Sequence, residues 1–231
     1  MTRLRQIALV AYRLAPVTGQ LERGLGVHNA FHDPGVGEFG LENAVYAVGA
    51  DFVEVVAPVA PVTAAERYLD RRGGDAGYMA LFQVPDMEAA RARLARLGIR
   101  AVWQVDFPDM AGTHLHPKQA PGAIVSLDWA EPAESWRWGG PDWAARATTT
   151  PSGLAGLTVA TLDPASAARA WAAVLDVPVG GTSLSLDGGA QRIDFVRAEH
   201  ERDEGISEVA LAGWDHEPVT VAGVAFRRGA G

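Results

Sequence analysis

Four short apolar segments that recur along the chain constrain its fold more than any other feature of the sequence. They are "QIALVAYRL" at 6–14, "MALFQVPDM" at 79–87, "LTVATLDPA" at 157–165 and "VALAGWDHE" at 209–217. Each reads as an apolar strand that runs into a turn. The first three lead into helical stretches, whereas the fourth leads almost directly into another strand, "VTVAGVAFRR". The chain is therefore expected to repeat one structural unit four times.

The second and third units show what such a unit contains. In "PDMEAARARLARLG", Asp86 is a typical helix N-cap and Gly98 a typical helix stop. In "DPASAARAWAAVLDVP", Asp163 is the cap, and Trp171 belongs to the apolar stripe. Short strand-like runs follow each helix, such as "RAVWQVD", "GTHLHP" and "AIVSLDW". The pattern predicts an α+β fold built from strand, helix and about three further strands per unit.

A segment rich in Pro, Gly and Trp, "AEPAESWRWGGPDWAARATTTPSG", separates the second unit from the third. We predict a first domain over residues 1–131, a linker over 132–152 and a shortened second domain over 153–231. The linker carries three tryptophans, Trp136, Trp138 and Trp143. We expect them to pack the linker across the two domains, and the alternative is that one of them caps a ligand pocket.

Composition excludes several classes of partner. The formal net charge is −8 and no run of basic residues offers a track for phosphates, so a nucleic acid is not expected to bind. The chain has no cysteine, which excludes disulfides and thiolate metal sites. Arginines interrupt the apolar amino-terminal stretch, so neither a signal peptide nor a membrane segment is predicted. We expect a cytoplasmic monomer or homodimer whose partner is a small molecule.

The repeated unit resembles that of the glyoxalase-like, vicinal oxygen chelate superfamily. The segments that carry the resemblance are "RYLDRRGGDAGYMALFQVPDMEAARARLARLGIRA" and "GTHLHPKQAPGAIVSLD", and this middle block is most similar to the methylmalonyl-CoA epimerase branch. The resemblance covers residues 4–131 well and residues 153–228 more weakly. It implies that paired βαβββ units curl a mixed sheet into an open cup. The missing helix of the fourth unit indicates that the second of the two domains is degenerate.

The resemblance also implies where a metal would be held. Metal-dependent members use one residue of the opening strand and one of the last strand of each unit, and these positions fall on Gln6, Glu54, Met79 and Ser126. A thioether and a neutral hydroxyl are poor ligands for a hard divalent ion. We therefore predict neither a metal nor another cofactor, and we expect Gln6, Met79 and Ser126 to contact a ligand instead.

Glu54 is the ionisable group that this set retains. Strand alternation places it on one face with Phe52 and Val56, so its carboxylate is expected among apolar neighbours, where desolvation raises its pKa. Such a group removes a proton from carbon or holds the polar end of a ligand. The alternative is a structural glutamate that is hydrogen-bonded to Gln6 or to a backbone amide.

Three further residues are candidates for the wall and the rim of the cup. Alternation along "GTHLHP" places His114 and His116 on one face, and the resemblance makes them wall residues, with His116 as a second candidate base. Metal binding and structural hydrogen bonding are the alternatives for both histidines. Asn43 lies in a Gly- and Pro-rich stretch that reads as a loop or irregular strand at the rim of the cup, and we expect it to bind the ligand.

Some of these positions have counterparts in the second domain. Asp194 corresponds to Glu54, Glu208 lies near the position of Met79, and Gly156 takes the place of Gln6. Either these residues mark a second site, or the second domain, whose fourth unit lacks a helix, is a degenerate half that supports the first domain.

Three functions are compatible with the sequence. The favoured one is binding of a small organic ligand in the cup, with a metal-independent lyase or isomerase reaction that proceeds by proton transfer. The second is a non-catalytic protein that binds a small molecule of the antibiotic type. The third is a metal-dependent lyase or dioxygenase with an altered ligand set.

Overall fold

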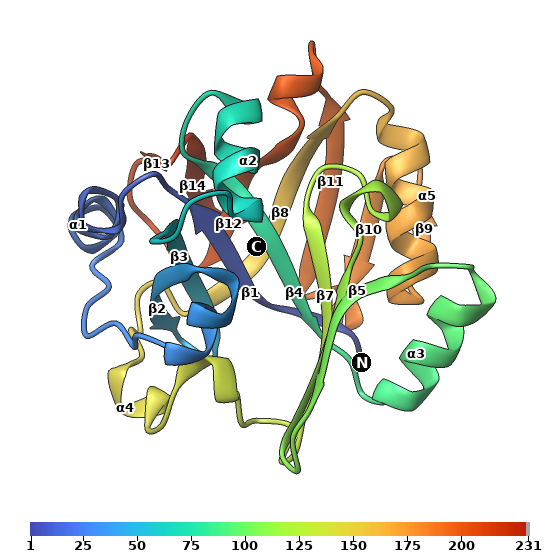
Figure 1. The fold of residues 1–231 in the computed structure, drawn as a ribbon, viewed down its shortest axis with the longest axis horizontal. Coiled ribbons are helices and arrows are strands. Elements are labelled where there is room, and N and C mark those ends of the chain that lie inside the picture. Colours follow the sequence, from blue (N-terminus) through green and yellow to red (C-terminus); the bar gives the residue numbers. More distant parts are fainter. Residues whose placement is uncertain (230–231) are drawn as a thin grey trace.

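Two curled seven-stranded sheets with helices packed against them make up the protein (Figure 1). The computed structural model describes residues 1–229, so the last two residues of the predicted second domain lie outside the described part. The predicted α+β class with paired units is confirmed. Whether each sheet belongs to a domain that folds alone stays a prediction, as do the proposed boundaries.

The first sheet has the strand order β2-β3-β1-β4-β7-β6-β5. Its strands are β1 (Arg3–Val10), β2 (Leu41–Val48), β3 (Asp51–Pro58), β4 (Ala76–Gln83), β5 (Ala101–Asp106), β6 (Met110–Leu115) and β7 (Ile124–Ala130). The opening strands β1 and β4 pair antiparallel at the centre, and each is flanked by the parallel closing strand of its own unit, β3 or β7. This pairing places the opening and closing strands of both units side by side in the middle of the sheet.

The second sheet repeats this order as β13-β14-β12-β8-β11-β10-β9. Its strands are β8 (Gly153–Thr161), β9 (Val179–Gly180), β10 (Ser183–Leu186), β11 (Gln191–Arg197), β12 (Gly205–Ala212), β13 (Val219–Val221) and β14 (Val224–Arg228). The fourth unit runs from β12 directly into β13, so the predicted loss of its helix is confirmed. In the first unit an isolated bridge between Phe31 and Val45 stands where a further strand was expected.

The predicted helices begin where their caps predict. The helices are α1 (Leu14–Leu25), α2 (Ala64–Arg72), α3 (Met87–Arg96), α4 (Trp143–Arg146) and α5 (Pro164–Leu175). The side chains of Asp86 and Asp163 accept hydrogen bonds from the first turns of α3 and α5. Helix α2 was not predicted, although Thr63 accepts from the amide of Glu66 and the run "TAAE" is a typical capping signal.

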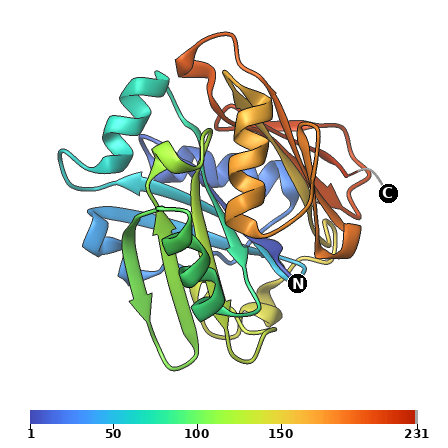
Figure 2. The same ribbon diagram turned by 90° about the vertical axis from the view of Figure 1, so that its right-hand side faces the viewer.

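One continuous apolar core joins the two sheets. It contains Ile7 and Val53 from the first sheet and Val159 and Val209 from the second. Figure 2 shows α3 and α5 side by side on this part of the molecule, and the Arg93 guanidinium of α3 donates to a carbonyl of α5 at 3.0 Å. The core lies on one face of the first sheet, which leaves the opposite face for a site.

Short 3-10 turns and the linker complete the chain. The turns are η1 (Pro34–Phe39), η2 (Pro117–Gln119), η3 (Arg137–Gly139), η4 (Asp187–Gly189) and η5 (Glu201–Asp203). The linker, with η3 and α4, packs against β2 of the first sheet (Figure 1). Among the described residues no helix has the length and apolar character needed to cross a membrane.

Candidate functional site

The face of the first sheet that lies opposite the core, which we call the cup, carries most of the predicted site. Strand register sets its side chains in rows. One row runs across β1, β4, β7 and β6 and consists of Gln6, Leu81, Ser126 and His114. The next row runs across β3, β1, β4 and β7 and consists of Glu54, Ala8, Met79 and Ile124. The four positions that the family resemblance singled out therefore lie in two adjacent rows.

Glu54 is buried at the centre of a hydrogen-bonded network. One carboxylate oxygen accepts from Nε2 of Gln6 at 2.9 Å, and the other accepts from Nδ2 of Asn43 at 2.7 Å. The Gln6 Oε1 atom in turn accepts from the indole N–H of Trp136 at 2.7 Å. The Asn43 Oδ1 atom accepts from the backbone N–H of Asp33 at 2.8 Å. Asn43 lies on β2, so of the two structures considered for this stretch, a loop or a strand, the strand is observed at this position.

The environment of Glu54 favours the neutral form through burial and the charged form through its partners. Desolvation raises the pKa of Glu54, hydrogen bonds from Asn43 and Gln6 lower it, and the charge of Asp33 raises it. Arg5 is the buried cation of β1, but its guanidinium donates to Gln83 Oε1 and to the Glu134 carbonyl, both at 2.9 Å. Glu54 is thus a buried carboxyl group whose partners are amides.

The donor set does not fit a divalent metal. Met79 packs against the apolar clusters at both ends of the cup, and the fully buried Ser126 directs its hydroxyl to the Thr113 carbonyl at 3.5 Å. The Gln6 side-chain oxygen, which is the atom that could ligate a metal, accepts a hydrogen bond from the Trp136 indole N–H. Within the described part of the chain, no three His, Cys, Asp or Glu side chains form a group that could hold a metal.

His114 forms an uncharged, aromatic wall of the cup. Its ring centroid lies 4.4 Å from that of Trp103 and 6.3 Å from that of Phe39. Burial lowers the pKa of His114 to about 4, so the ring is neutral at neutral pH. Phe39 ends η1, two residues before the edge strand β2 begins, and Trp103 lies on the other edge strand, β5. The centroids of these two rings are 5.6 Å apart. These rings join the two edges of the sheet across the cup.

His116 does not join the group around Glu54. Strand β6 ends at Leu115, and His116 is an exposed residue that caps the start of η2. Its Nδ1 atom accepts from the backbone N–H of Lys118 at 3.2 Å. The Pro117 ring, which lacks an amide hydrogen, ends the strand pairing here.

A second buried carboxyl group, Asp128, was missed by the sequence analysis. It lies on β7 two residues beyond Ser126 and therefore faces the cup as well. One oxygen accepts from the Trp138 indole at 2.9 Å, and the other is buried without a partner in the described structure. Desolvation by burial is the largest cause that raises its pKa, to about 7, and the hydrogen bond from Trp138 acts in the opposite direction. Alternation along "SLD" is the signal that could have found it.

The linker tryptophans pack on the first sheet. Trp136 is fully buried and stacks on Phe52 at a centroid distance of 6.2 Å, and Trp143 meets the same ring at 5.2 Å. Trp138 lies over Trp103 and bonds to Asp128. The expectation that these rings pack across the two halves of the chain is wrong, because all three pack in one apolar cluster on the cup face of the first sheet.

Register in the second sheet places charged residues at the corresponding positions. Arg192 pairs with Gly156 and Asp194 with Thr158, as Phe52 pairs with Gln6 and Glu54 with Ala8. Glu208 faces Thr158 as Met79 faces Ala8. The fourth position, that of Ser126, is taken by Arg227, whose guanidinium lies 2.7 Å from Glu208. Arg192 also forms an ion pair with Asp194 at 2.8 Å, so each of the two acids has an arginine partner, and both acids are partly exposed.

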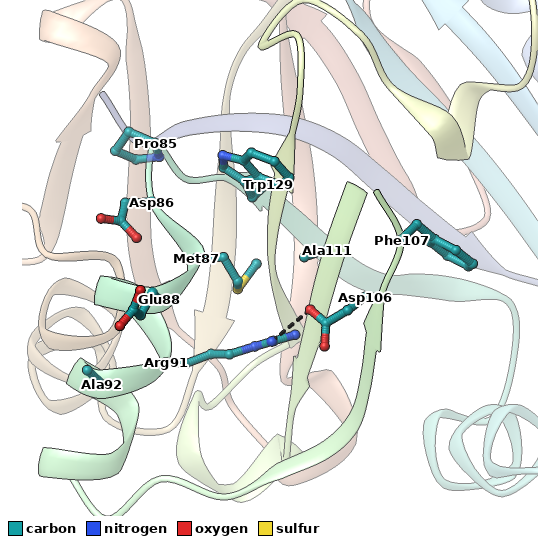
Figure 3. A pocket seen from close by; sticks show the side chains of 10 residues that line it. All are labelled: Pro85, Asp86, Met87, Glu88, Arg91, Ala92, Asp106, Phe107, Ala111 and Trp129. Atoms are coloured by element: carbon teal, nitrogen blue, oxygen red, sulfur yellow. Dashed lines mark hydrogen bonds and ion pairs between the residues drawn. The ribbon is translucent and has the colours of Figure 1, made fainter. Parts of the chain in front are cut away.

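Two surface pockets lie away from the cup. The larger, of about 710 Å³, is lined by Pro85, Asp86, Met87, Glu88, Arg91, Ala92, Asp106, Phe107, Ala111 and Trp129 (Figure 3). Figure 3 shows Arg91 and Asp106 pointing toward each other, and they form an ion pair at 2.8 Å. Arg91 also donates to Thr113 at 3.0 Å, so its charge is engaged by the protein itself. The smaller pocket, of about 440 Å³, lies between α1 and β2.

No protein-family model and no curated protein matches the chain. Solved structures do match. A variant of methylmalonyl-CoA epimerase from Streptomyces coelicolor, in complex with 2-nitronate-propionyl-CoA, is 19% identical with a TM-score of 0.51, over 59% of this chain and 99% of that one. A mutant of 4-hydroxymandelate synthase from Streptomyces coelicolor is 16% identical with a TM-score of 0.67, over 91% of this chain and 70% of that one. At such identities the likeness shows the fold alone.

Proposed function

From the premise that this chain has the fold of the glyoxalase-like, vicinal oxygen chelate superfamily, we propose that its cup binds a small carbonyl compound and that Glu54 removes a proton from it without a metal. The reaction class is that of an isomerase or lyase. Ligand contacts are assigned to Gln6, Met79, His114, Ser126 and Asn43, which share the cup with Glu54.

The observation that carries this proposal is the buried Glu54 carboxyl group with an amide N–H on each oxygen. A general base must be fixed in position and must retain a free lone pair. Each carboxylate oxygen has two lone pairs, so one hydrogen bond to each leaves acceptor capacity for a substrate proton. Glu54 is 8% exposed, and its row includes the partly exposed Met79 and Ile124. We infer that a ligand approaches the carboxylate past these two side chains.

The choice of a carbonyl compound draws on the relatives. The similar epimerase structures hold acyl-CoA compounds, including methylmalonyl-CoA and 2-nitronate-propionyl-CoA. A carbonyl group acidifies the C–H bonds of the neighbouring carbon. Removal of a proton from that carbon is the reaction that a lone carboxylate base serves best. Asp128 is the other titratable carboxyl group on the same face, and we assign it no step in the proposed reaction.

A ligand screen followed by an exchange measurement tests the proposal. Carbonyl metabolites, CoA thioesters and aromatic antibiotics are screened by thermal shift, because a specific ligand stabilises the folded state by mass action. Each hit is then incubated in D2O, and incorporation of deuterium at its acidic carbon is followed by NMR. We expect exchange with the wild type and a loss of about 100-fold or more with Glu54→Gln. Exchange that survives this substitution refutes the proposed role of Glu54.

A non-catalytic binding protein is the second candidate. The feature that favours it is the replacement of three of the four usual metal donors by Gln6, Met79 and Ser126. A ligand that binds without any exchange would support this alternative. Elemental analysis of the protein, purified without a metal-affinity tag, tests the metal-dependent alternative, which requires about one ion per chain. A cytoplasmic location and a monomeric or homodimeric state stay predictions.

A further inference from the structure

The two amide side chains that contact Glu54 have their orientations fixed from behind. An amide presents an acceptor oxygen on one side and a donor NH2 group on the other. The Gln6 oxygen accepts from the Trp136 indole N–H, and the Asn43 oxygen accepts from the Asp33 backbone N–H. Both of these groups can only donate. Each amide must therefore turn its NH2 group, and not its oxygen, toward Glu54.

This orientation is the opposite of what a metal requires. A glutamine or asparagine ligates a cation through its oxygen. Here both oxygens point away from Glu54, and two N–H donors occupy the approaches to its carboxylate at 2.9 and 2.7 Å. A cation beside Glu54 would face the positive ends of two amide dipoles. The network thus excludes a cation from this carboxylate and supplies the hydrogen bonds that stabilise its charge.

The charged groups around the network do not replace these hydrogen bonds. Asp33 adds a negative charge, and the His32 ring bonds to the Asn43 carbonyl at 2.5 Å. Arg5 stacks near Trp136, with its guanidinium carbon 5.4 Å from the ring centroid, but donates to Gln83. His114 faces the cup from β6 as a neutral ring.

We propose that an indole–amide–carboxylate network has taken the place of the metal in this cup, and that Trp136 is the positioning residue that sets its polarity. The inference rests on the hydrogen bonds of the protein and is independent of any ligand. The linker thereby becomes a part of the site, since Trp136 lies outside both sheets.

NMR of the side-chain amides tests the positioning role. In the wild type, a long-range HNCO experiment should connect the Gln6 NH2 group with the Glu54 carboxyl carbon and the Trp136 indole N–H with the Gln6 amide carbon. Trp136→Phe keeps a ring on Phe52 but removes the donor, so the Gln6 NH2 resonances should shift or split into two sets. Trp143→Phe is the matched control, because Trp143 contacts the same Phe52 ring and none of the described hydrogen bonds involves its indole.

Each outcome decides one part of the inference. Absence of both connections in the wild type, an unchanged Gln6 signal in Trp136→Phe, or an equal change in both variants would overturn the positioning role. Addition of equimolar Mn²⁺ to the wild type should leave the Gln6 and Asn43 amide signals sharp, because paramagnetic broadening requires a nearby ion. Selective broadening of these signals would overturn the exclusion of metal. Neither result depends on whether a carbonyl ligand is found.

Discussion

Replacing Glu54 by Gln is nearly isosteric, yet the network predicts that it is costly. A carboxylate offers acceptors on both sides, and in this protein it meets an NH2 group on each side, from Gln6 and from Asn43. A glutamine offers one acceptor and one donor, so one of these contacts becomes donor against donor. Turning Gln6 over moves the conflict to Trp136, and turning Asn43 over moves it to Asp33. The chain of hydrogen bonds cannot be repaired by flips.

The magnitude follows from one buried polar group left without a partner. Such a group costs about 1–3 kcal/mol, and the 8% exposure of Glu54 leaves little access to water. We therefore expect Glu54→Gln to lower the free energy of unfolding by about 2 kcal/mol. In a chain of this length that corresponds to a fall in Tm of about 4–8 °C.

A double-mutant cycle measured by urea unfolding makes the test specific. Trp136→Phe removes the donor that holds Gln6, so Gln6 can turn its oxygen toward the amide introduced at position 54 in the double variant. The two changes together should cost about 1 kcal/mol less than the sum of the single changes. The cycle of Glu54→Gln with Trp143→Phe should be additive. A Glu54→Gln protein as stable as the wild type would refute the reasoning. It would mean that Glu54 is protonated in the wild type, because a protonated carboxyl group, like an amide, offers one donor and one acceptor.

Three other changes follow from the structure. Burial raises the pKa of Asp128 to about 7, so its contribution to stability is present below the ordinary aspartate pKa and is lost as the pH rises through 7. Between pH 5 and pH 8.5, the free energy of unfolding of Asp128→Asn should therefore fall less than that of the wild type, and at pH 8.5 the variant should be the more stable protein by about 1 kcal/mol or more. An equal dependence of the two unfolding free energies on pH would contradict this. A Cβ on Gly77 would lie 2.6 Å from Ile206 Cβ in the second sheet, so Gly77→Ala should destabilise the protein by about 1–3 kcal/mol in chemical unfolding, while Gly74→Ala, which meets nothing within 4 Å, should not. Thr63→Ala removes the N-cap of α2 and should cost about 1 kcal/mol; unchanged stability would show that the cap is dispensable.

The cup was implied by the family resemblance, whereas strand periodicity predicted which side chains share a face, because every side chain of a strand must take one of two faces. The opening and closing strands of each unit could be placed, and with them Gln6 and Glu54 on one face. The same reasoning extends to Asp128, two residues beyond Ser126, although it was not applied there. The Gly156, Asp194 and Glu208 correspondences also agree with the observed register.

The residues that periodicity could not place lie where the chain leaves regular structure. His116 follows the last residue of β6, so alternation no longer governs its side chain. Trp136 lies in a linker whose path depends on tertiary packing, and nothing local in "ESWRWGG" indicates that its indole meets Gln6 across 130 positions. The polarity of the network, which decides between a metal site and an amide-bound carboxylate, depends on this long-range contact.

Neutron diffraction from crystals exchanged into D2O at pH 8 would locate the hydrogens of the network directly. The account predicts deuterated Gln6 Nε2 and Asn43 Nδ2 atoms directed at Glu54, a deuterated indole nitrogen on Trp136, and no deuteron on either Glu54 oxygen. A deuteron on Glu54, or an amide oxygen turned toward it, would contradict the account.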